Sequence, residues 1–250
     1  LQFHAWNYAD PRWLDSLFWL QELKEEGLIR HLGLTNFDTA HLRIVLHSGI
    51  DVVSNQVCFS LLDQRARQDM TRLCLEQGIK LLAFGTVAGG FLTKRWLGKP
   101  EPDWEALETW SQMKYGRFID VAGGWDLFQD LLRTVDDVAR RHGVSMANVA
   151  SRYILEQPAV GGVIIGARLG TSQHIEDNLR LFQFSLDGAS QSAIDAALAK
   201  LQPIPGDCGD EYRKPPFLTA SGDLSHHLES MPPPYADQPG RGGRSIVLSG

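Results

Sequence analysis

Cysteine, positive charge and long apolar runs are all scarce in this chain of 250 residues. The 3 cysteines are odd in number and irregularly spaced, which argues against a disulfide framework and favours reduced thiols in the cytoplasm. No apolar run approaches the roughly 20 residues that a transmembrane helix needs. No strongly basic stretch is present and the net charge is −6, which argues against nucleic acid as a partner. We therefore expect a cytoplasmic protein that binds neither membranes nor nucleic acids.

Several motifs of known enzyme classes are also missing. No G-x-G-x-x-G turn follows a predicted strand, which weighs against a dinucleotide-binding doubly wound sheet. No G-x-S-x-G elbow is present, which weighs against a serine hydrolase. His226 and His227 are adjacent in a polar stretch and lack the spacing of a structural zinc site. We therefore expect no metal site.

The chain does contain short apolar strands that alternate with amphipathic helices. Five strands are predicted, at about 1–4, 29–34, 51–56, 79–84 and 160–165. Helices are predicted at about 13–26, 39–47, 64–77, 103–113, 125–142, 145–157, 172–182 and 190–201. Repeated βα units with apolar strands indicate a parallel sheet covered by helices, and hence an α/β fold.

An open doubly wound sheet and a (β/α)8 TIM-type barrel both agree with this pattern, and we favour the barrel. Because a barrel needs eight strands, five strands predict an incomplete one, whose intact form is on the order of 100 residues longer. We assign residues 1–202 to this partial barrel. Residues 203–250 hold eight of the twelve prolines and read as a loop-like C-terminal tail. Within the tail, 208–218 mixes charged and aromatic residues, and its folding back across the barrel mouth stays an alternative.

Polar side chains follow three of the predicted strands at the point where each strand ends. His4 ends the first strand, Thr35 and Asn36 end the second, and Gln56 ends the third. Side chains at the carboxyl ends of parallel strands point into the ligand cleft of such folds. An imidazole donates a hydrogen bond to a substrate oxygen, and amides recognise a carboxamide or a base edge. A core histidine and ordinary strand termination are the structural alternatives.

Two further segments are typical of phosphate and ring binding. Phe84 ends the fourth strand and is able to stack on a flat ring, and the small-residue loop after it, with Gly85, Val87 and Gly89, lets backbone N–H groups approach phosphates. A flexible loop is the alternative there.

After the last strand, Gly166 and Arg168 precede a helix start, which is a recurrent phosphate site of barrels. Arg168 adds a bidentate partner for a phosphate. Asp177 and Asn178, in the helix that follows, either contact an adenine or ribose or belong to a solvated helix face.

Taken together in their order, these motifs resemble the aldo-keto reductases over roughly residues 1–200. The motifs are QFH at 2–4, GLTNF at 33–37, NQV at 55–57, LAFG with AGGFL at 82–92, and IGAR through EDN at 165–178. This family folds as (β/α)8 barrels and uses NADP(H) to reduce carbonyls. By the resemblance, His4 orients the substrate carbonyl, while Thr35, Asn36 and Gln56 hold the nicotinamide carboxamide.

The resemblance also implies roles for the later motifs. Phe84 occupies the position of the aromatic residue, commonly Tyr, that stacks beneath the nicotinamide. The segment with Gly85, Val87 and Gly89 corresponds to the pyrophosphate loop. Gly166, Arg168 and Asn178 correspond to the part that grips the adenosine phosphate end, and the charge of Arg168 favours NADP over NAD.

The family's proton-donor Tyr, with the Asp and Lys that tune it, comes from earlier strands and has no counterpart here. We therefore expect an NADP(H)-dependent oxidoreductase that reduces small carbonyl compounds, with this chain as a truncated form that is inactive alone. The alternatives are a nucleotide-binding or interaction subunit that resembles the potassium-channel β-subunits, or an inactive fragment. The sequence indicates no oligomeric state.

Overall fold

A sheet of five parallel strands forms the centre of the molecule. The computed structural model describes residues 1–6, 8–104, 107, 109–167, 170 and 174–213. The strands are β1 (Gln2–His4), β2 (Gly33–Thr35), β3 (Ser54–Cys58), β4 (Lys80–Phe84) and β5 (Val160–Ile164), and they pair in chain order. All four pairings are parallel. Within the described residues β1 and β5 each pair with one neighbour, so this part of the barrel is open, as predicted.

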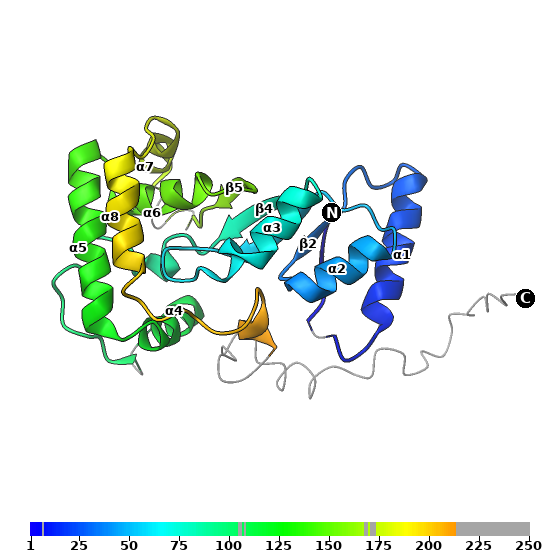
Figure 1. Ribbon diagram of the computed structural model, residues 1–250, viewed down its shortest axis with the longest axis horizontal. Coiled ribbons are helices and arrows are strands. Elements are labelled where there is room, and N and C mark those ends of the chain that lie inside the picture. Colours follow the sequence, from blue (N-terminus) through cyan, green and yellow to red (C-terminus); the bar gives the residue numbers. More distant parts are fainter. Residues whose placement is uncertain (7, 105–106, 108, 168–169, 171–173, 214–250) are drawn as a thin grey trace, which may run out of the picture.

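The two faces of the sheet differ in character. Leu34, Val57, Leu81 and Ala83 lie on the face that helices cover, and all four are fully buried. The opposite face carries polar side chains and corresponds to the interior of a barrel, to which each strand contributes alternate residues. Figure 1 shows α2 (Thr39–His47) and α3 (Asp69–Glu76) along the covered face, with α1 (Arg12–Glu25) at the β1 end.

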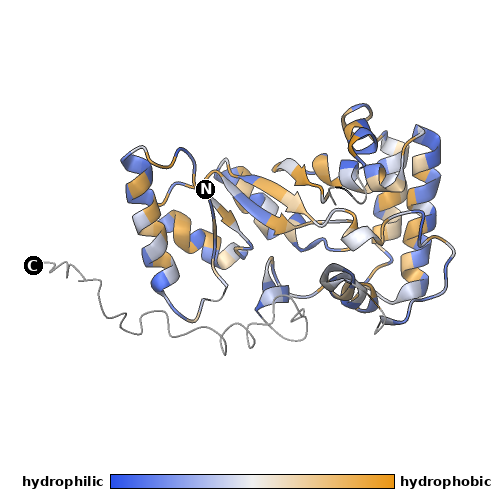
Figure 2. Ribbon diagram, turned by 180° about the vertical axis from the view of Figure 1, so that it is seen from behind, coloured by the Kyte–Doolittle hydropathy of each residue, from blue (hydrophilic) through white to orange (hydrophobic). Residues whose placement is uncertain are grey.

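The remaining helices lie around the β5 end of the sheet. They are α4 (Trp110–Val121), α5 (Trp125–His142), α6 (Met146–Leu155), α7 (Ile175–Leu179) and α8 (Gly188–Leu198). Elsewhere along the chain, short 3-10 helices lie at Arg65–Arg67, Ala88–Gly90, Arg180–Phe182 and Asp210–Tyr212. Figure 2 shows apolar residues concentrated in the strands and mixed along the helices, as helices with one buried side require. No helix of the described part of the chain is long and apolar enough to cross a bilayer.

Most predicted elements are confirmed within a few residues, but three predictions were wrong. The strand expected at 51–56 is β3 at Ser54–Cys58, so Gln56 lies inside the strand and does not end it. The helix expected at 103–113 begins only at Trp110, because the Thr109 side chain caps it by accepting from the Gln112 N–H. The helix expected at 64–77 is broken, because Gln68 has a non-helical backbone between the 3-10 turn and α3.

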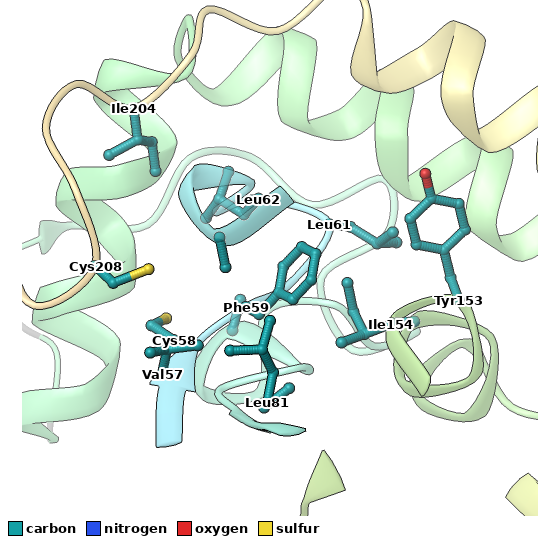
Figure 3. Close-up of a cluster of buried hydrophobic side chains, with 14 of the residues drawn as sticks. Val57, Cys58, Phe59, Leu61, Leu62, Leu81, Tyr153, Ile154, Ile204 and Cys208 are labelled. Atoms are coloured by element: carbon teal, nitrogen blue, oxygen red, sulfur yellow. The ribbon is translucent and has the colours of Figure 1, made fainter. Parts of the chain in front are cut away.

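The first part of the predicted tail packs against the sheet. Ile204 and Cys208 are buried, and Figure 3 shows Cys208 beside Cys58 of β3. We call residues 207–213 the return segment. It lies at the carboxyl ends of the strands, where Asp207 Oδ2 accepts from the Thr39 N–H at 2.8 Å. The rest of the predicted tail, with His226 and His227, lies outside the described residues.

Candidate functional site

Three of the predicted site residues form one row across three neighbouring strands. His4 pairs with Thr35, and Thr35 pairs with Gln56. Residues in parallel register share a face of the sheet, so these side chains all point toward the barrel interior. Each of the three is half-buried, which leaves it accessible from that side. The structure therefore brings together the histidine, the hydroxyl and one amide.

Asn36 lies one residue beyond this row in a left-handed conformation with a φ of 56°. Its backbone is fixed by the Gln56 carbonyl, which accepts from its N–H at 2.8 Å, and by Arg213, which donates to its carbonyl at 2.6 Å. The side chain is 95% buried, yet its Oδ1 has no hydrogen-bond partner among the described residues. A buried amide oxygen without a donor is costly, so the position favours a ligand N–H.

His4 is the second residue of this site with an unsatisfied polar atom. Its Nε2 is buried without a partner in the described part of the chain. Burial, and then the positive charge of Arg213, lower the pKa of its imidazole below 6.5. His4 is therefore neutral at pH 7, and one tautomer places an N–H donor at Nε2.

A buried lysine approaches the ring of Phe84. Lys114, from α4, places its Nζ 5.0 Å from the centroid of that half-buried ring. The Nζ donates to the Tyr212 hydroxyl at 2.8 Å and lies 3.3 Å from Glu211 Oε1. Burial lowers the pKa of Lys114, but Cys58, Tyr115, Glu211 and Tyr212 together raise it well above its ordinary value. Lys114 is therefore a fixed cation beside the aromatic residue of the site.

This lysine belongs to a buried charge cluster, which we define as Asp63, Arg65, Lys114 and Glu211. Arg65 contacts Asp63 at 2.6 Å and Glu211 at 2.8 Å, and all four side chains are at most 5% exposed. Burial raises the pKa of Asp63, but Arg65 lowers it more, so the net shift is downward. The cluster ties the return segment to the loop after β3 and to α4.

Cys58 lies close to this cluster. Together with Asp63 and Glu211 it offers three donor atoms of the kind that bind metals. The Cys58 thiol and the carboxylates of Asp63 and Glu211 have donor atoms within 4.8 Å of one another. Both carboxylates already neutralise Arg65 and Lys114, and burial raises the pKa of the thiol. A cation here would have to displace two buried positive charges, so the group is poorly suited to a metal.

The small-residue loop after β4 has a structural role that the sequence did not reveal. Gly85 and Gly89 have φ values of 74° and 62°, and a Cβ at either position would overlap Tyr115 of α4. Close packing of α4 therefore accounts for both glycines. Val87, between them, is half-buried.

The residues after β5 are less closely tied to this arrangement. Gly166 is exposed, and Arg168 lies outside the described residues. The Asp177 carboxylate accepts from the Ser145 hydroxyl at 2.8 Å, which anchors α7 to the start of α6. Asn178 is half-buried, and its N–H donates to the His174 carbonyl at 2.7 Å.

Comparison with known proteins decides the family. A model of the aldo/keto reductase family matches residues 1–199, which is most of the chain. The chain belongs to the aldo/keto reductase family. Among solved structures, a glycerol dehydrogenase from Gluconobacter oxydans has a TM-score of 0.66 and 22% identity over 82% of this chain and 60% of its own. The five parallel strands are thus part of an aldo/keto reductase barrel, as predicted.

Two curated proteins are similar to this chain at the level of sequence. The protein tas of Escherichia coli is 26% identical over 200 residues, and flagellar radial spoke protein 5 of Chlamydomonas reinhardtii is 32% identical over 136 residues. These matches take in 77% and 54% of this chain, but only 55% and 26% of the relatives. The chain therefore spans about half or less of the length of these curated relatives.

Several groups near the site escaped the sequence analysis. Tyr8 and Arg213 donate to the Asn36 carbonyl, Lys114 lies over the Phe84 ring, and Tyr212 accepts from Lys114. The mixture of charged and aromatic residues at 208–218 was the available signal, because such residues are unusual in a proline-rich tail. For Lys114 we find no sequence signal.

Proposed function

We propose that the protein containing this chain reduces small carbonyl compounds by hydride transfer from NADP(H). The observation that carries the proposal is the row of His4, Thr35 and Gln56 on one face of three adjacent strands. His4, Thr35 and Phe84 end β1, β2 and β4, whereas Gln56 lies two residues before the end of β3. Barrel enzymes place their reactive groups at the carboxyl ends of the strands. Membership of the aldo/keto reductase family supports the reaction class.

The residues present suit a nicotinamide. The buried Oδ1 of Asn36 lacks a donor, and a carboxamide N–H would supply one. Thr35 and Gln56 place a hydroxyl and an amide on one face of the sheet, and the half-buried ring of Phe84 offers a flat apolar surface. A bound nicotinamide cofactor supplies the hydride.

His4 acts on the substrate in this proposal. Its imidazole is neutral at pH 7, so its Nε2–H donates a hydrogen bond to the carbonyl oxygen and polarises it. By resemblance to the family, the proton comes from a tyrosine for which this chain has no counterpart. Preference for NADP(H) rests on Arg168, together with Gly166 and Asn178 at the adenosine phosphate end.

Substitution of Gln56 tests the cofactor assignment. We expect Gln56→Ala to weaken binding of the reduced cofactor by about 2–13-fold, since roughly one neutral hydrogen bond is lost. Hydride transfer should also become less stereospecific, because the carboxamide fixes which ring face points toward the substrate. The measurements are fluorescence titration with NADPH and with NADH, and analysis of product from cofactor deuterated on one face.

Gln2→Ala is the matched control, because Gln2 lies on the same face of the sheet as Gln56 but at the amino end of its strand, β1. Unchanged cofactor affinity and stereospecificity in Gln56→Ala would contradict the carboxamide assignment. Tighter binding of NADH than of NADPH would contradict the choice of NADP(H).

A second candidate is a nucleotide-binding subunit without turnover. It is favoured by the similarity to a protein whose name describes a component of the flagellar radial spoke. Cofactor binding at the same row, with no oxidation of NADPH by any carbonyl compound tested, would support this candidate over the reductase.

A further inference from the structure

Arg213 reaches the candidate site from the far end of the described chain. Its Nη1 donates to the Asn36 carbonyl and its Nη2 to the Ala5 carbonyl, both at 2.6 Å. Its guanidinium carbon lies 4.3 Å from the centroid of the Tyr8 ring. These three contacts fix the guanidinium at the carboxyl ends of β1 and β2, directly after His4 and Thr35.

None of these contacts neutralises the charge. Arg65 and Lys114 are each buried against a carboxylate, whereas Arg213 forms no ion pair within the described part of the chain. Its Nε is buried and has no acceptor there. The guanidinium is partly buried and its hydrogen bonds within the described residues go to backbone carbonyls, so an anion that reaches the remaining N–H groups of Nη1 and Nη2 gains a charge-assisted hydrogen bond.

The unsatisfied donors share one corner of the site. His4 Nε2 also lacks a partner, and the charge of Arg213 is near enough to contribute to the lowered pKa of His4, although burial contributes more. A molecule whose oxygen accepts from His4 therefore has a cation within reach of its other end. The planar guanidinium matches the geometry of a carboxylate.

We propose that Arg213 binds a carboxylate of the substrate, and that the preferred substrates are small oxo acids rather than neutral aldehydes. This inference rests on the proposed carbonyl reduction. The residue that selects the substrate class then belongs to the return segment and not to the row of His4, Thr35 and Gln56. Arg213 is thus a specificity-determining residue.

A matched pair of aldehydes tests the inference in the whole protein. 4-Oxobutanoate and butanal differ only in a carboxylate in place of a methyl group. We expect the ratio of their kcat/KM values to favour 4-oxobutanoate. Arg213→Gln should lower that ratio by about 10–100-fold, as expected for loss of a hydrogen bond to a charged group. Arg213→Lys should retain part of the preference, and Arg30→Gln, at an exposed arginine before β2, should retain all of it.

A binding measurement separates this inference from the proposed function. Calorimetry with NADP⁺ present compares the affinities for the two aldehydes without turnover. If neither aldehyde is reduced but 4-oxobutanoate binds more tightly and Arg213→Gln abolishes the difference, the carbonyl reduction is wrong and the anion site stands. Equal kcat/KM values for the two aldehydes would overturn the anion site and leave the reductase intact. An effect of Arg213→Gln on NADPH affinity alone would make Arg213 a cofactor ligand and also overturn it.

Discussion

Replacement of Glu211 by leucine would remove the carboxylate that joins the return segment to the rest of the protein. Glu211 is fully buried and accepts from Arg65 at 2.8 Å and from Lys114 at 3.3 Å. After Glu211→Leu, Arg65 keeps its contacts with Asp63. Lys114 keeps only the neutral Tyr212 hydroxyl as its hydrogen-bond partner in the described structure. The substitution therefore leaves a buried ammonium group without its ion-pair partner.

The expected cost follows from the burial of Lys114, whose side chain is 5% exposed. Breaking a buried ion pair by removing one partner costs about 3–5 kcal/mol, because the remaining charge is desolvated without compensation. In a domain of this size such a loss lowers Tm by about 6–20 °C. The double variant Lys114→Met/Glu211→Leu should regain most of this loss, since an apolar pair of similar volume often replaces a buried ion pair at little cost.

Urea unfolding followed by tryptophan fluorescence measures these changes. Asp69→Asn is the control, because its ion pair with Arg72 is more than 60% exposed on both sides and should contribute at most about 1 kcal/mol. A Glu211→Leu variant within 1 kcal/mol of the wild type would refute the reasoning. The reasoning would also be refuted if the double variant lost as much free energy of unfolding as the two single variants added together, because the two side chains would then not interact.

Two other measurements test local features of the site. Gly85→Ala should lower the free energy of unfolding by about 1–3 kcal/mol more than Gly90→Ala, as measured by urea titration. Both positions have positive φ, but only at Gly85 would the added methyl group overlap Tyr115. In NMR titrations His4 should have a pKa below 6.5, and Arg213→Gln should raise it without restoring 6.5, because burial is the larger cause. With this lowered pKa, the folded state binds fewer protons than the unfolded state. The contribution of His4 to stability is therefore present above pH 6.5 and is lost as the pH falls through the folded pKa. A folded pKa of 6.5 or more would contradict this prediction.

The elements of the fold could be predicted well from the sequence where local signals were strong. Helix α5 was predicted with its observed bounds, because Gly124 and Gly143 bound an amphipathic run at both ends. Helix α4 was misplaced, because its buried residues pack on the glycine loop after β4 and on the return segment, and neither contact is visible from local periodicity. Tertiary packing decided the bounds there.

For the candidate site, the sequence by itself determined which residues end three of the strands. Alternation of strands and helices puts His4, Thr35 and Phe84 at one end of a parallel sheet, because all strands of such a sheet run the same way. For Gln56 this prediction was wrong, since β3 continues to Cys58. That the four side chains share one face of the sheet followed only from the strand register. A shift of one residue would have turned the side chains of a strand to the other face. The contacts of Lys114 with Glu211 across 97 residues, and of Arg213 with Asn36 across 177, were decided by the tertiary structure alone. Contacts between residues so distant in sequence depend on how the intervening elements pack, and no local pattern encodes them.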